Sequence, residues 1–142
     1  MPTTSDSRKN KVSVQYAVPR RGVPSAASLR KWARLASASD ITLRIVGERE
    51  GRSLNRTFRG KAQATNVLSF DTGDIVLCHP VITREARAQR KTVAAHYAHL
   101  VVHGVLHLRG YAHEKKRDAR RMEAREIALL RRAGVRNPYT VE

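Results

Sequence analysis

Hydrophobic and polar positions alternate near the start of the chain, where Val12, Val14, Tyr16 and Val18 are separated by polar or small residues. A period of two predicts a half-buried strand. Residues 41–46 (ITLRIV) predict a second strand. Residues 66–70 and 74–78 (NVLSF and DIVLC) predict two more, and the turn residues of DTG between them indicate a hairpin.

Helical spacing takes over in the remaining segments. Apolar residues after Pro24 predict a helix that ends near Ser39, and Leu54 with Phe58 predicts a short helix that ends before Gly60. Further helices are predicted over residues 82–90, from a cap at Thr92 to about residue 108, and over residues 114–133. Glycines at 110 and 134 are expected to terminate the last two helices.

Strands come early in this order and helices come late, which predicts an α+β fold. We expect a small mixed β-sheet of about four strands packed by about five helices, with a metal site at the end of a central helix. Residues 1–10 are polar and predict a disordered N-terminal tail, while residues 11–142 predict a single domain.

The net charge of the chain favours one class of binding partner. The chain carries 28 Lys plus Arg against 12 Asp plus Glu, a net charge of +16. A field of this sign attracts polyanions, so nucleic acid is the expected partner and an anionic membrane surface the weaker alternative. The lone cysteine, Cys78, excludes an intramolecular disulfide framework. No apolar run approaches the roughly 18 residues of a membrane span, so we expect a cytoplasmic protein with no membrane partner.

The segment HGVLHLRGYAH, residues 103–113, carries the candidate chemistry. His103 and His107 are four residues apart, so on a helix their imidazoles point the same way. Gly110 can adopt a positive φ and turn the chain back, which would bring His113 to the same point. We therefore expect one divalent transition-metal ion on these three histidines. Imidazole suits zinc, nickel, copper and iron, and zinc is the leading expectation.

Three neutral imidazoles would leave the ion an open coordination position, at which water can ionise near neutral pH. The spacing matches the zinc-protease pattern HExxHxxGxxH except that Gly104 replaces the glutamate that acts as base. A metalloprotease is thereby disfavoured. A phosphodiester suits a dication beside basic side chains better, because negative charge accumulates on the phosphate oxygens, and this favours RNA hydrolysis.

The histidine motif, preceded by FRGKAQATNVLSF and GDIVLC, resembles the YbeY family of bacterial endoribonucleases that mature ribosomal RNA. The resemblance runs from about Leu54 to Tyr139. It implies a mixed sheet with packed helices, one zinc-like ion on three histidines, and cleavage of single-stranded RNA. It also implies work at the 3′ end of 16S rRNA and in ribosome quality control, with the small ribosomal subunit and its assembly factors as partners.

The same resemblance implies a functional role for Arg59, since the family's arginine falls on that position. An arginine can clamp a phosphate with two hydrogen bonds or stabilise developing negative charge. His99, Lys61 and Asn66 are lesser candidates for contacts with RNA or behind the metal ligands. The chain departs from the family pattern at Ala112, where an aspartate is usual, and in the short connection from Phe70 to Asp74. The alternative function is a non-catalytic rRNA-binding assembly factor with a structural metal.

Overall fold

A computed structural model describes residues 11–111 and 115–140. Four strands form one mixed sheet in the order β1, β2, β4, β3. Strands β1 (Val12–Tyr16), β2 (Ile41–Val46) and β4 (Asp74–Cys78) are parallel, and β3 (Val67–Ser69) pairs with β4 in the antiparallel direction. The predicted hairpin is therefore confirmed. The predicted tail, residues 1–10, lies outside the described residues.

Five helices are present in the described ranges, as the spacing predicts: α2 (Ala26–Ala36), α3 (Glu48–Arg59), α4 (His79–Ala88), α5 (Val93–Leu108) and α6 (Lys116–Arg132). The side chain of Thr92 accepts a hydrogen bond from the backbone N–H of Ala95, so the predicted cap of α5 is confirmed. The predicted start of the last helix, Glu114, lies outside the described residues. These helices confirm the predicted α+β class.

Two helices begin earlier than their apolar spacing predicts. Helix α3 is a full 12 residues long, and its first turn contains Glu48 and Glu50, whose negative charge interacts favourably with a helix N-terminus. Helix α4 starts at His79 and includes Pro80 in its first turn, where a missing N–H costs nothing. Predictions based on apolar residues alone miss such polar or proline-containing first turns.

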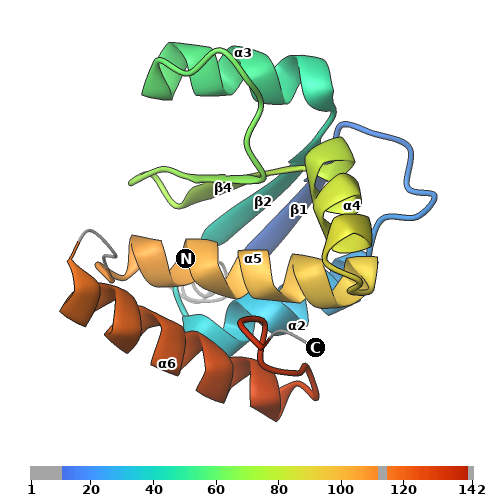
Figure 1. Cartoon of the computed structure of the whole chain (residues 1–142). Coiled ribbons are helices and arrows are strands. Elements are labelled where there is room, and N and C mark those ends of the chain that lie inside the picture. The colour runs from blue at the N-terminus through green and yellow to red at the C-terminus, as the bar shows by residue number, and fades with distance from the viewer. Residues whose placement is uncertain (1–10, 112–114, 141–142) are drawn as a thin grey trace, which may run out of the picture.

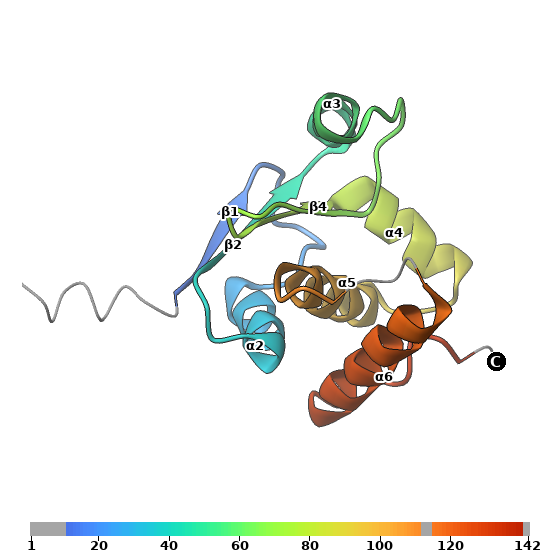
Figure 2. The same cartoon turned by 90° about the vertical axis from the view of Figure 1, so that its left-hand side faces the viewer.

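The sheet lies between two layers of helices (Figures 1 and 2). Helix α3 covers one face, and α2, α5 and α6 lie on the opposite side. Helix α5 is the central helix, since it packs against the sheet and against α2, α4 and α6. Its contact with the sheet is close at Gly104, where an added Cβ would lie 3.1 Å from Oγ of Ser69 and 3.2 Å from Cγ2 of Ile75. The last two turns of α5 are thereby held against β3 and β4.

Within residues 11–111 and 115–140, no helix combines the length and apolar character needed to cross a membrane.

Candidate metal centre and adjoining cleft

Two of the three predicted metal ligands face one another at the C-terminal end of α5. The Nε2 atoms of His103 and His107 lie 3.2 Å apart. Two imidazole nitrogens that bind one tetrahedral zinc ion with bonds of ~2.0–2.1 Å lie about 3.3 Å apart. The spacing of these two donor atoms therefore fits a shared transition-metal ion. His113, the predicted third ligand, and its neighbour Ala112 lie outside the described residues.

The opposite side of the His103 ring contacts a buried carboxylate from α6. Nδ1 of His103 lies 2.9 Å from Oε2 of Glu126, whose side chain is completely buried. Nε2 of His99 lies 3.0 Å from the same oxygen, and the hydroxyl of Tyr139 donates to Oε1 at 2.7 Å. Both carboxylate oxygens are thus hydrogen bonded to groups from α5 and the C-terminal segment.

These contacts determine the charge of Glu126 and the tautomer of His103. Burial by itself raises the pKa of Glu126, but the hydrogen bonds from His103, His99 and Tyr139 outweigh it and lower the pKa to about 2. An ionised carboxylate only accepts hydrogen bonds, so His103 donates through Nδ1–H. A neutral His103 ring then has its lone pair on Nε2, the atom that faces His107. This is the form in which histidine binds a metal.

A second set of donor atoms overlaps the first. Atoms of His99, His103 and Glu126 lie within 4.8 Å of one another and could hold a metal ion. His103 belongs to both sets, and its two ring nitrogens face different partners. The two arrangements therefore differ in whether Glu126 binds the ion directly or supports His103 from behind.

A cleft of about 400 Å³ lies beside these histidines and brings Arg59 to them. Arg59, His103 and His107 line it together with residues of β3 and of the turn that follows. Nη2 of Arg59 donates to the backbone oxygen of Ser69 at 2.9 Å, and the guanidinium carbon lies 5.4 Å from the centroid of the Phe70 ring. The α3 and α5 residues that were singled out in separate parts of the sequence thus meet in one cleft.

The three lesser candidates, His99, Lys61 and Asn66, lie in different places in the structure. His99 contacts Glu126 behind the metal ligands. Asn66 lines the cleft, but its side-chain amide donates to Oε1 of Glu85 at 3.0 Å, and that oxygen also lies 2.8 Å from Nε2 of buried His96. Burial lowers the pKa of His96 despite the nearby carboxylate, which keeps the ring neutral in a structural bond. Lys61 is exposed after the end of α3.

Sequence reasoning missed Glu126 and Tyr139. The signal for Glu126 was a single acidic residue within the apolar face of α6, four residues after Met122 and three before Leu129, all of which are buried. A carboxylate on such a face requires hydrogen-bond partners, and the histidine-rich face of α5 offers them. Tyr139 follows the last helix and has no comparable signal in the sequence.

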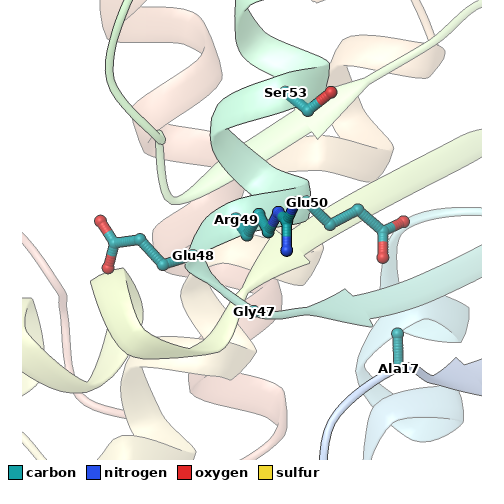
Figure 3. Close-up of a pocket in the computed structure, with 6 residues that line it drawn as sticks. All are labelled: Ala17, Gly47, Glu48, Arg49, Glu50 and Ser53. Carbon is teal, nitrogen blue, oxygen red and sulfur yellow. The ribbon is translucent and has the colours of Figure 1, made fainter.

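A larger hollow, of about 520 Å³, lies at the start of α3 and has no convergent chemistry (Figure 3). Glu48 and Glu50 point to opposite sides of this hollow. Glu48 pairs with Arg84 at 2.9 Å, and Glu50 pairs with Arg44 at 2.7 Å. Because each carboxylate is directed to its own arginine, this hollow is not the candidate site.

Comparisons with known proteins identify related sequences and a structure with a similar fold. The chain is 46% identical to an endoribonuclease YbeY of Xanthomonas axonopodis and 45% identical to one of Stenotrophomonas maltophilia; each alignment covers 92% of this chain and 94% of the relative. A solution structure from Thermotoga maritima has a similar fold, with a TM-score of 0.55, 22% identity, and coverage of 87% of this chain and 92% of that one. The profile of the family described as Endoribonuclease YbeY matches residues 6–134, and the chain belongs to that family.

Proposed function

We propose that this chain is a metal-dependent endoribonuclease that cleaves single-stranded RNA, with one zinc ion on His103, His107 and His113. The observation that carries the proposal is the cleft in which Arg59 from α3 lies beside the facing Nε2 atoms of His103 and His107. Membership of the YbeY family and the net charge of +16 support RNA as the substrate.

The ion, Arg59 and Glu126 have different roles in the proposed reaction. When bound, the ion supplies a Lewis acid that polarises a phosphate oxygen or lowers the pKa of a water molecule. Arg59 binds the phosphate and stabilises the charge that develops on it. Its bonds to the backbone oxygens of Ser69 and Phe58 leave other N–H groups of the planar guanidinium for this purpose. Glu126 holds His103 in the orientation and tautomer that ligation requires.

We further propose that the cytoplasmic role is maturation of the 16S rRNA 3′ end and ribosome quality control, carried out by a single domain of residues 11–142. The small ribosomal subunit and its assembly factors would be the partners. Family membership and the basic surface support this assignment.

Elemental analysis of purified protein, followed by RNA cleavage assays, tests the proposal. We expect about one equivalent of a transition metal per chain, and cutting of a single-stranded oligoribonucleotide but not of its duplex. Chelation should abolish cutting, and added zinc should restore it. His103→Ala should remove both the metal and the activity, whereas Arg120→Ala, at an exposed position of α6, is the control. Cleavage that persists unchanged in the metal-free protein would contradict the proposal.

One observation favours a second candidate, an rRNA-binding assembly factor with a structural metal. The set of His99, His103 and Glu126 contains a fully buried carboxylate, and a buried ion with such ligands would serve stability. Unfolding of the His103→Ala variant, together with no cleavage by the wild-type protein, would support this candidate. A folded His103→Ala variant that binds RNA without cutting it would support the endoribonuclease.

A further inference from the structure

Phe58 lies on α3 but is not buried by the fold. It follows Leu54 by one helical turn and Gly51 by two, so it extends the side of α3 that packs on the sheet. Gly51 is buried and Leu54 is half-buried, yet 54% of Phe58 is exposed. The predicted helix through Leu54 and Phe58 is present and ends before Gly60, but the fold does not bury Phe58. An aromatic ring left in water costs free energy. The exposure of Phe58 therefore points to a role other than packing in the core.

The Phe58 ring is held in place despite its exposure. Its centroid lies 5.2 Å from that of Phe70, and the two ring planes are 76° apart, an edge-to-face contact. Phe70 is also the ring on which the Arg59 guanidinium lies, at 5.4 Å. Phe58 thus contacts Phe70, and Phe70 contacts Arg59. Arg59 in turn lines the cleft with His103 and His107.

The surroundings of Phe58 are cationic and suit a nucleic acid strand. Arg56, Arg59 and Lys61 are all exposed within three residues of it. A phosphate bound by Arg59 would place the bases of the same strand beside the exposed ring. Stacking of a base on an aromatic ring is independent of sequence and requires a base that is not already stacked in a duplex.

We propose that Phe58, supported by Phe70, is a stacking platform for an unpaired nucleobase of the RNA strand that occupies the cleft. The proposal rests on the proposed function and adds to it a physical source for the preference for single strands. A paired base is already stacked on its neighbours and has no free face for Phe58, whereas an unpaired base gains a stacking partner at the entrance of the cleft.

Fluorescence anisotropy of the full-length, metal-loaded protein tests the platform. The probes are a 2′-O-methyl oligoribonucleotide of six bases, an abasic backbone of the same length, and a duplex, each checked on a gel after the measurement. The variants are Phe58→Ala, Phe58→Leu, which keeps an apolar contact with Phe70, and Phe58→Trp. Thr57→Ala, at the exposed neighbouring position, is the matched control.

Phe58→Ala should raise the Kd for the base-bearing probe about 5- to 150-fold, which corresponds to ~1–3 kcal/mol for one stacked base. Phe58→Leu should raise the Kd for this probe nearly as much as Phe58→Ala does. Phe58→Trp, which keeps an aromatic ring, should bind the probe about as tightly as wild type. None of the variants should change the Kd for the abasic backbone or the duplex, and the slope of log Kd against log salt should stay unchanged, since no phosphate contact is lost.

Equal binding by Phe58→Leu and wild type would overturn the platform, because an aliphatic side chain offers no ring on which a base can stack. Equal loss for base-bearing and abasic probes would also overturn it and would assign Phe58 to the positioning of Arg59. Equal Kd values of the wild-type protein for the base-bearing and abasic probes would overturn the platform as well. Failure of the proposed function is distinguishable, since it would appear as absence of cleavage of an unmodified strand by the wild-type protein, whatever the binding ratios.

Discussion

Nδ1 of His103, on α5, lies 2.9 Å from Oε2 of Glu126, a fully buried carboxylate on α6. The same oxygen also contacts His99, and the other oxygen accepts the hydroxyl of Tyr139. This relationship joins the two helices that flank residues 112–114 and turns Nε2 of His103 towards His107.

Replacement of Glu126 should weaken metal binding. Glu126→Gln keeps the shape of the side chain but replaces one accepting oxygen with an NH₂ donor, so His103, His99 and Tyr139 can no longer all donate to it. We expect an affinity for zinc that is about 10- to 100-fold lower, as measured by competition with a chromophoric chelator. Glu123→Gln, on the same helix, is the control. An unchanged zinc affinity would show that Glu126 does not support His103.

The two sets of donor atoms predict different outcomes for two histidines. If the ion lies between His103 and His107, His107→Ala should lose the bound metal and His99→Ala should retain about one equivalent. Elemental analysis after gel filtration measures both. Loss of the metal from His99→Ala with retention in His107→Ala would instead place the ion between His99, His103 and Glu126.

Arg59 should act on the reaction and not on the metal. Arg59→Lys keeps the charge but loses the planar guanidinium, which both contacts Ser69 and would bind the phosphate. We expect single-turnover cleavage to slow by about 100-fold, the effect of losing one donor to a charged transition state. The zinc content should not change. Arg56→Lys, exposed on the preceding turn, is the control, and an equal effect of both substitutions would refute a specific role for Arg59.

Introduction of the protease glutamate should damage the fold. Gly104 faces the sheet, and even a Cβ there would approach Ser69 and Ile75 closely. Gly104→Glu would place a carboxylate in this contact, and we expect the free energy of unfolding to fall by ~3 kcal/mol or more. Urea denaturation measures the change, with Gly104→Ala as the smaller perturbation. A stable Gly104→Glu variant with peptidase activity would contradict this account.

Stability should decline in mildly acidic solution partly through His79. Burial lowers the pKa of His79 below its ordinary value of 6.5, and Nδ1 lies 2.7 Å from the hydroxyl of buried Tyr97. The unfolded chain therefore binds more protons than the folded one as the pH falls below 6.5, so the free energy of unfolding decreases there. Urea midpoints at a series of pH values should fall more steeply for wild type than for His79→Gln. Parallel curves would refute the contribution of His79.

Local patterns predicted most elements because they depend on local rules. The alternation at Val12 and Val14 gave a strand, Thr92 capped α5 as expected, and the DTG turn joined two antiparallel strands. The starts of α3 and α4 were less predictable, since apolar spacing carries no information about a polar or proline-containing first turn. Spacing predicted the helix that carries Phe58, but the exposure of Phe58 depends on what surrounds the end of α3 and not on a local pattern.

What the sequence by itself determined is the local chemistry: two imidazoles four residues apart on one helix, a glycine after them, and a strongly basic chain. Helical geometry alone makes those two rings neighbours. Only the tertiary structure decided that Arg59 shares their cleft and that Glu126 reaches His103 across the contact between α5 and α6. These residues are 44 and 23 positions from His103 in the sequence, and their approach depends on how α3, α5 and α6 pack on the sheet, which no local pattern encodes.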